Sequence, residues 1–531
     1  MSILSRLPFG KKPDPASAGR GPVTGCDLSH AEALVRPFAQ DAFFRLRPPF
    51  SKEAAQLSLE LADMTYTLEL APWKAAGWND FSILIDDSLQ SGLTHWETGD
   101  GLGSVINRIK VLRAKAALKE PSPVSQVLSA LRQKEKSDTV KAVCMMHPLP
   151  EDKWLLAIGF MGTGKRFYDW FSNFRFTPEE GFHRGFNQLC ESFQLHVEDI
   201  VFPAVAEAMG LEKLTLGQVL SDMRSLSSPF RLWMAGHSQG GAVMQVFTHR
   251  LMNDWGILPQ NMVGYGFASP TVATGKFVYD PAAYPLYHIL NSEDIVPRLG
   301  ALLHLGLCME YTPDEAFRQS AYPPFDSEEE ALRSELAFFA DGIRDTPTAI
   351  VHMAALMECL AQEKGADGLT ELMTSWWAVP AVDRVLWRAG DKGLEMLGRL
   401  LTGMKDGYLA LTKQSAPTEE IIRIRERLRP IIQQTSVRRL LSAMSAYAVP
   451  PHILSSEEGG AHARIVQNHL EDAKPFIWIK SPKNLPVRRY ADWAQSFAPV
   501  WAESLRARRM PVRPVQRSSK LRMSYSAQRN A

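Results

Sequence analysis

The residues most able to carry out chemistry lie in residues 230–242, which read Phe-Arg-Leu-Trp-Met-Ala-Gly-His-Ser-Gln-Gly-Gly-Ala. An apolar run of strand length ends there in Gly-x-Ser-x-Gly, and a pattern of helical spacing follows at once. This context predicts a strained strand-to-helix turn that exposes Ser238. Gly236 and Gly240 are expected where a side chain would collide with the neighbouring strand and helix. The first N–H groups of the new helix would stabilise an oxyanion beside the serine, so the spacing indicates a nucleophile.

An acid that could support this serine follows a later apolar run of strand length, residues 287–291. In the chain order Ser, Asp, His, the orienting carboxylate lies at the carboxyl end of a strand after the nucleophile strand. Asp294 is the expected acid, which would hold the histidine tautomer and stabilise the imidazolium. Glu293 is the neighbouring alternative.

A glycine-rich exit, residues 159–164, follows the apolar run 154–160 and could supply further oxyanion donors. The next segment, 165–176, is flanked by Gly164 and Pro178 and has an aromatic helical face. We expect either a lid over an apolar pocket or a helix packed permanently on the core. The four aromatic residues of the candidate lid are Phe167, Trp170, Phe171 and Phe174.

The elements that must position these groups are short apolar runs alternating with helical patterns. The runs 142–146 and 154–160 are separated by a turn sequence and predict a hairpin. Together with the runs before Ser238, at 262–268 and at 287–291, they predict an α/β fold: a central, mostly parallel sheet covered by helices on both faces.

Five segments in order resemble the class 3 lipases, which are fungal-lipase-like members of the α/β-hydrolase fold. The segment 159–163 is similar to the family's Phe-Arg-Gly-Thr/Ser, 182–186 to His-x-Gly-Phe, and 236–242 to Gly-His-Ser-Leu-Gly-Gly-Ala. The segment 267–270 is similar to Phe-Gly-Ser-Pro, and 291–299 to Asn-x-x-Asp-x-Val-Pro-Arg-Leu.

The resemblance implies a Ser-His-Asp ester hydrolase that needs no cofactor or metal. Ser238 would be the nucleophile, Asp294 the acid, and Thr163 together with the backbone N–H of Gln239 the oxyanion hole. Two positions depart from the family pattern: Met161 replaces an arginine, and Gln239 replaces a leucine.

The catalytic base is the least defined member of this predicted triad. His304 matches a structural histidine of the family. His352 lies at a family-like distance beyond the acid and is favoured, although Thr346 and Pro347 predict a helix that would bury it. His462 and His469 are the alternative bases.

Composition is that of a soluble globular protein: 531 residues, 45% hydrophobic, 22% charged, with a net charge of +1. The five cysteines have no metal-ligand spacing and are expected to be buried free thiols of a reducing compartment. Neither a signal peptide nor a transmembrane run is recognised, so a cytoplasmic location is expected, with non-classical export left open.

We expect four regions along the chain. Residues 1–50 are a largely disordered leader, 51–360 the lipase-like domain, and 361–505 a helical region. That helical region is either a packed addition or a surface for a lipid interface. Residues 506–531 form a basic disordered tail that could touch anionic membrane, with no specific recognition of nucleic acid.

The aromatic candidate lid favours a lipid or other acyl-chain ester as substrate. The expected function is therefore carboxylic ester hydrolysis. The alternatives are a catalytically weak or inactive lipase-like binding or scaffolding protein, and a thioesterase.

Overall fold

A computed structural model describes residues 50, 52–67, 70–80, 142–150, 153–162, 177–196, 219, 221–274, 283–292, 294, 296–312, 327–377, 391–437, 439–440, 443, 474–480 and 486–490. Several predicted features lie outside these residues. They are the leader up to residue 49, Thr163, the four aromatic residues of the candidate lid, Glu293, His462, His469 and the basic tail.

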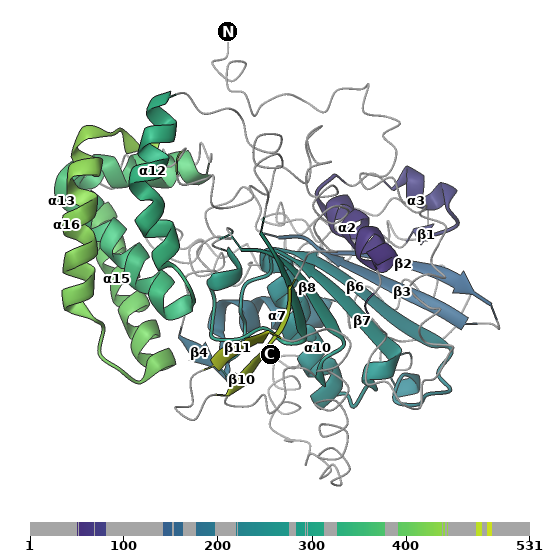
Figure 1. Cartoon of the computed structure of the whole chain (residues 1–531). Helices are drawn as coiled ribbons and strands as arrows, with labels where there is room; N and C mark the ends of the chain where they lie inside the picture. The colour runs from purple at the N-terminus through teal and green to yellow at the C-terminus, as the bar shows by residue number, and fades with distance from the viewer. Residues whose placement is uncertain are drawn as a thin grey trace, which may run out of the picture.

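The described residues contain one large sheet with the strand order β1-β2-β3-β6-β7-β8-β9-β10-β11 (Figure 1). The strands from β3 to β9 run parallel, and an antiparallel pair is added at each edge. Their bounds are β1 Asn79–Asp80, β2 Ala142–Leu149, β3 Lys153–Phe160, β6 Phe230–His237, β7 Met262–Phe267, β8 Leu286–Asn291, β9 Leu307–Tyr311, β10 Lys474–Lys480 and β11 Pro486–Tyr490. A separate small ladder joins β4 Pro178–Glu179 to β5 Phe182–His183.

Helices cover both faces of this sheet, as the continuous apolar runs predict. On one face lie α2 (Lys52–Thr67) and α3 (Ala71–Ala75), and on the other lie α7 (Arg184–His196) and α10 (Gln239–Asn253). Successive residues of β6 serve the two faces in turn: Leu232 packs in the cluster with α7 and α10, whereas Trp233 packs in the cluster with α2. The three-layer α/β fold is therefore confirmed, and so is the hairpin of β2 and β3.

Four further helices form a helical module beside the sheet (Figure 1). They share one hydrophobic cluster and are α12 Ser327–Gly342, α13 Thr346–Trp377, α15 Asp391–Thr412 and α16 Thr418–Gln434. The module begins before the predicted boundary at residue 360, which falls inside α13. The predicted helical region also contains two strands, because β10 and β11 return to the sheet and pair beyond β9.

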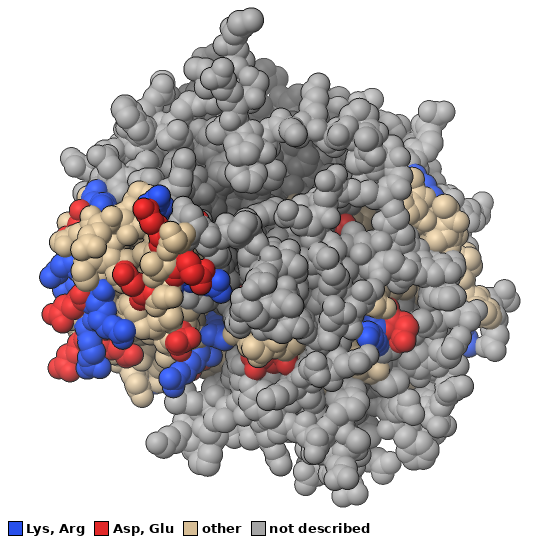
Figure 2. All heavy atoms as spheres, turned by 45° about the horizontal axis from the view of Figure 1, so that its top comes forward, with Lys and Arg blue, Asp and Glu red and all other residues tan. Residues whose placement is uncertain are grey.

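Three of the four arginines of α16 contact other residues of the helical module. Arg425 lies 3.5 Å from a Glu358 carboxylate oxygen, and Arg429 donates to Glu363 at 2.9 Å. Arg427 lies over the Phe338 ring, 3.7 Å from its centroid. On the visible face of the module, basic and acidic side chains are interspersed (Figure 2). These are the contacts of a packed helical addition with a charged outer face. In the described part of the chain, no helix has the length and apolar character needed to cross a membrane.

Candidate active site

Ser238 occupies the turn between β6 and α10 in a strained backbone conformation. Its φ is 53° and its ψ is −125°, a region that side-chain-bearing residues rarely adopt and that costs about 1–3 kcal/mol. Serine is a favoured helix N-cap, yet the Ser238 hydroxyl makes no capping hydrogen bond to α10. The turn is instead fixed through the backbone, because the Ser238 N–H donates to the Phe267 carbonyl at 2.8 Å. The predicted strained strand-to-helix turn, which we call the elbow, is present, and the Ser238 hydroxyl makes no capping hydrogen bond to the helix. The role of Ser238 as a nucleophile stays a prediction.

The two glycines of the motif are required by close packing, as predicted. A Cβ at Gly236 would lie 2.7 Å from backbone atoms of Gly240 and Gly241 in α10. A Cβ at Gly240 would lie 2.5 Å from the Met161 carbonyl oxygen, at the end of β3. The start of α10 and the exit of β3 therefore meet at Gly240.

This meeting brings Gln239, one of the two predicted oxyanion donors, close to the described end of the glycine-rich exit at Met161 and Gly162. Gln239 is the first residue of α10, at the positive end of the helix dipole. Gly162 directly follows Met161 and is buried. Thr163 is the next residue along the chain and lies outside the described residues.

A row of backbone hydrogen bonds connects Ser238 with the strand that leads to the acid. The Ala268 N–H, one residue beyond the Phe267 carbonyl that holds Ser238, donates to the Ile289 carbonyl at 3.1 Å. Ala268 has a φ of 49°, a conformation usual for glycine, and it stands where the family pattern has glycine. Only β7 separates the ends of β6 and β8, so two strand spacings place those ends roughly 10 Å apart.

Asp294, three residues beyond β8, is fully buried. Its Oδ1 accepts a hydrogen bond from the Val296 N–H at 2.8 Å, whereas its Oδ2 has no partner among the described residues. Burial raises the pKa of Asp294 to about 7, against the lowering effects of the Val296 N–H and the Arg298 charge. A buried carboxylate oxygen without a donor is costly, so this site is suited to receive an N–H from another group.

His304 has the structural role that the resemblance implies. It is fully buried, and its Nε2 lies 2.7 Å from the Ser269 carbonyl oxygen. Its ring lies 5.3 Å from that of His288, whose Nε2 is 2.8 Å from the Leu305 carbonyl oxygen. Burial lowers the pKa of His288 to about 4. These two imidazoles are part of the core beneath the elbow.

His352 lies inside α13, as the helix start at Thr346 predicts. Its ring packs edge-on against Phe339, and a side chain at Gly342 would overlap it. Its Nδ1, the atom that an orienting carboxylate binds in a triad, lies 2.9 Å from the Thr348 carbonyl oxygen. Burial lowers its pKa, against the effects of the Thr348 carbonyl and Glu420. These contacts are those of a histidine in the core of the helical module, and its predicted role as the base stays a prediction.

Strands β10 and β11, which were not predicted, lie beyond β9 in the sheet and follow the segment that carries His462 and His469. Lys474 begins β10 opposite Glu310 of β9, and Glu310 pairs in turn with Leu290 near the end of β8. Because β10 is antiparallel to β9, it begins beside the carboxyl end of β9. The Asp294 loop leaves β8 at that same end of the sheet. The apolar run Phe-Ile-Trp-Ile at residues 476–479 was the available strand signal.

Four of the five cysteines lie in the described part of the chain, and their side chains are buried as expected. Cys144, Cys190, Cys308 and Cys359 are buried and free. Burial raises the pKa of the Cys144 thiol to about 12, which makes it unreactive. Within the described ranges, no cluster of three or more His, Cys, Asp or Glu side chains is arranged to hold a metal ion.

Comparison with solved structures finds several fungal lipases. A fungal lipase–inhibitor complex is 22% identical, with a TM-score of 0.24, and the match covers 32% of this chain and 61% of that one. The Rhizomucor miehei lipase propeptide complex is 20% identical, with a TM-score of 0.22 and coverage of 33% and 52%. Lipase II from Rhizopus niveus is 18% identical, with a TM-score of 0.22 and coverage of 32% and 61%. At these scores the fold assignment rests on the strand order and register above.

Comparison with curated protein sequences finds no match. Comparison with family models matches residues 157–303 to "Lipase (class 3)". That span runs from β3 through the elbow and the Asp294 loop to the residue before His304, and it contains Ser238, Gln239 and Asp294 but not His352. Residues 157–303 of this chain are therefore a class 3 lipase family domain.

Proposed function

We propose that the chain is a serine hydrolase that cleaves carboxylic esters of acyl-chain lipids. One observation carries the proposal: Ser238 and Asp294 follow the carboxyl ends of parallel strands of one sheet. Ser238 is strained and its hydroxyl makes no capping hydrogen bond to α10, and Asp294 is buried with one carboxylate oxygen unpaired among the described residues. The class 3 lipase match and the aromatic residues at 167–174 support a lipid ester over a short polar ester. Because the chain covers only 52–61% of the fungal lipases above, this substrate class is part of the proposal.

In the proposed reaction, Ser238 Oγ attacks the carbonyl carbon of the ester while a histidine accepts the hydroxyl proton. The carbonyl oxygen becomes an oxyanion that accepts hydrogen bonds from the Gln239 N–H and from Thr163. Collapse of this intermediate breaks the bond to the alcohol, which leaves with the proton returned by the histidine. Water then attacks the acyl-serine by the same route and releases the fatty acid. Each oxyanion donor is expected to contribute about 3 kcal/mol.

Asp294 would act by accepting the histidine Nδ1–H on its unpaired Oδ2. That hydrogen bond fixes the tautomer whose Nε2 accepts the serine proton. It also supplies the donor that the buried oxygen lacks among the described residues.

For the base, we propose His469 ahead of His462, and both ahead of His352. His469 precedes Lys474 by five residues, a length of chain that spans at most about 18 Å. Lys474 starts β10 at the carboxyl end of β9, two strand spacings from β8, the strand that leads to Asp294, and we therefore propose that His469 is the residue that meets the acid. His462 is seven residues further from Lys474. His352 has its Nδ1 engaged by Thr348 and its ring enclosed in the helical module.

Labelling with a fluorophosphonate probe tests the nucleophile. Wild-type protein is expected to react and Ser238→Ala protein is not. The base is tested by comparing His469→Ala, His462→Ala and His352→Ala in hydrolysis of p-nitrophenyl esters. Loss of one triad member lowers kcat by several orders of magnitude, so only one of the three variants should fall that far. A wild-type protein that neither labels nor hydrolyses would support the lipase-like binding protein instead.

Chain length and linkage complete the test. Rates that rise from acetyl to octanoyl and longer esters would support a lipase. Rates that collapse beyond short chains would contradict the lipid substrate, and faster cleavage of matched acyl thioesters would favour a thioesterase.

A further inference from the structure

The turn between α12 and α13 is bonded directly to the acid loop, by which we mean residues 291–298. The Arg298 guanidinium donates to the Ser292 carbonyl inside the acid loop. It also donates to the carbonyl of Ile343, which directly follows α12. One side chain therefore joins the loop that carries Asp294 to the helical module.

A second connection runs through the first residue of α13. The Thr346 side chain is buried, and its hydroxyl donates to the Arg298 carbonyl at 2.7 Å. The same hydroxyl lies 3.0 Å from that of Thr271, which donates to the Leu299 carbonyl at 2.8 Å. The start of α13 is thus tied to the acid loop and to the segment after β7.

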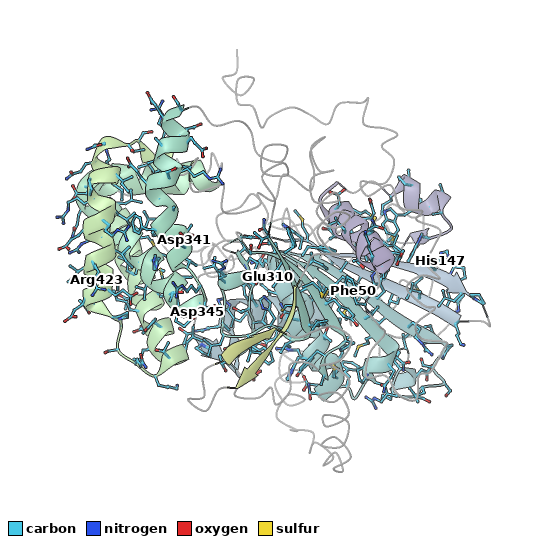
Figure 3. All side chains as sticks on the ribbon, in the orientation of Figure 1. Phe50, His147, Glu310, Asp341, Asp345 and Arg423 are labelled. Atoms are coloured by element: carbon cyan, nitrogen blue, oxygen red, sulfur yellow. The ribbon has the colours of Figure 1, made fainter. Side chains whose placement is uncertain are left out.

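Hydrophobic packing continues this attachment beyond Arg298. Ala301 is fully buried and belongs to the hydrophobic cluster of the helical module, against which Leu299 and Leu302 also pack. Figure 3 places Asp341 and Asp345, which flank the α12–α13 turn, on the side of the module that faces the sheet. A displacement of this turn would therefore displace the acid loop.

The charges around Asp294 make Arg298 important for a second reason. Among the described residues, Arg298 is the charged side chain that lowers the pKa of Asp294. The charged groups on the adjoining turn, Asp341, Arg344 and Asp345, are exposed. The nearby imidazole on the sheet side, His304, is buried and bonded to Ser269.

We propose that Arg298 and Thr346 are positioning residues, through which the helical module holds Asp294 in the orientation that the catalytic base requires. The inference rests on the proposed function, since it assigns a role to Asp294 as the acid of the triad. Neither residue touches the substrate. On this view the α12–α13 turn of the helical module anchors the acid.

The test is the pH dependence of ester hydrolysis by full-length variants, with kcat normalised to folded protein. Thr346→Val removes the hydroxyl at nearly constant volume and should lower kcat about tenfold. Thr346→Ser keeps the hydroxyl, so its kcat should stay at the wild-type value. Arg298→Gln should lower kcat about 100-fold, the usual effect of misplacing a catalytic group by about 1 Å.

The acid limb, by which we mean the fall of kcat/KM on the acidic side of its pH profile, distinguishes the positioning effect of Arg298 from the effect of its charge. Loss of the Arg298 cation makes the coupled Asp–His pair hold its proton more tightly, so Arg298→Gln should move that limb to higher pH. Arg298→Lys keeps the charge, so its limb should stay in place. Its kcat should still fall, because an ammonium does not bridge two carbonyls as a guanidinium does.

Arg429→Gln is the matched control, because it breaks an ion pair with Glu363 inside the same module. It should leave kcat and the acid limb unchanged. The inference is overturned if Thr346→Val and Arg298→Lys retain wild-type kcat, even if Arg298→Gln does not fold. It is also overturned if Arg298→Gln folds and retains both the wild-type kcat and the wild-type acid limb. An inert wild-type protein would instead remove the proposed function, and this inference with it.

Discussion

Replacing Gly240 by alanine tests whether the elbow and the exit of β3 form one oxyanion site. The added Cβ would lie 2.5 Å from the Met161 carbonyl oxygen, whereas ordinary van der Waals contact begins near 3.4 Å. The exit of β3 and the start of α10 must therefore separate by about 1 Å. A displacement of that size in a catalytic constellation costs about 100-fold in rate, which corresponds to about 2.7 kcal/mol of transition-state stabilisation. Overpacking should also lower the free energy of unfolding by about 1–3 kcal/mol.

The measurements are kcat/KM on an acyl p-nitrophenyl ester, the rate of fluorophosphonate labelling, and thermal unfolding. Gly403→Ala is the control, because a Cβ at Gly403 in α15 would meet no atom within 4 Å. It should raise the free energy of unfolding by about 0.5–1 kcal/mol through helix propensity and leave the kinetics unchanged. If Gly240→Ala protein is folded and labels at the wild-type rate, the two oxyanion donors do not depend on this contact and the reasoning is refuted.

Two further predictions concern the core that supports the site. His288 is buried with its pKa lowered to about 4, so the unfolded chain binds its proton first and stability should decline as pH falls from 6.5 toward 4. This difference in pKa corresponds to at most about 3 kcal/mol of stability. Chemical denaturation at several pH values measures the decline, which should be smaller in His288→Gln. A His288→Gln protein with the wild-type pH profile would contradict the prediction. Ser58 of α2 accepts a hydrogen bond from the Trp233 indole N–H at 2.8 Å, so Ser58→Ala should lower the free energy of unfolding by about 1–3 kcal/mol. Calorimetry would measure this loss, and an unaltered melting temperature would count against it.

The sequence by itself determined the local elements of the site. Gly236 and Ser238 specify the elbow because the strain at the serine and the clash of a Gly236 side chain with α10 arise between residues near one another in the chain. The clash at Gly240 is different, because it involves Met161 at the end of β3. The hairpin of β2 and β3 and the helix start at Thr346 were predictable for the same reason: turn residues and capping act over a few residues. Periodicity also specified an α/β sheet buried on both faces.

Tertiary structure alone determined which segments meet at the carboxyl ends of the parallel strands. The return of β10 to β9 joins segments more than 160 residues apart, and no local pattern specifies such a pairing. The contacts of Arg298 with Ile343 and of its carbonyl with Thr346 likewise depend on where the helical module packs. The surroundings of Asp294 and His352 follow from that packing, because burial and hydrogen-bond partners are properties of the assembled fold. Residue spacing thus identified Ser238 and Asp294 as candidates, and the arrangement of distant segments determined which groups can serve them.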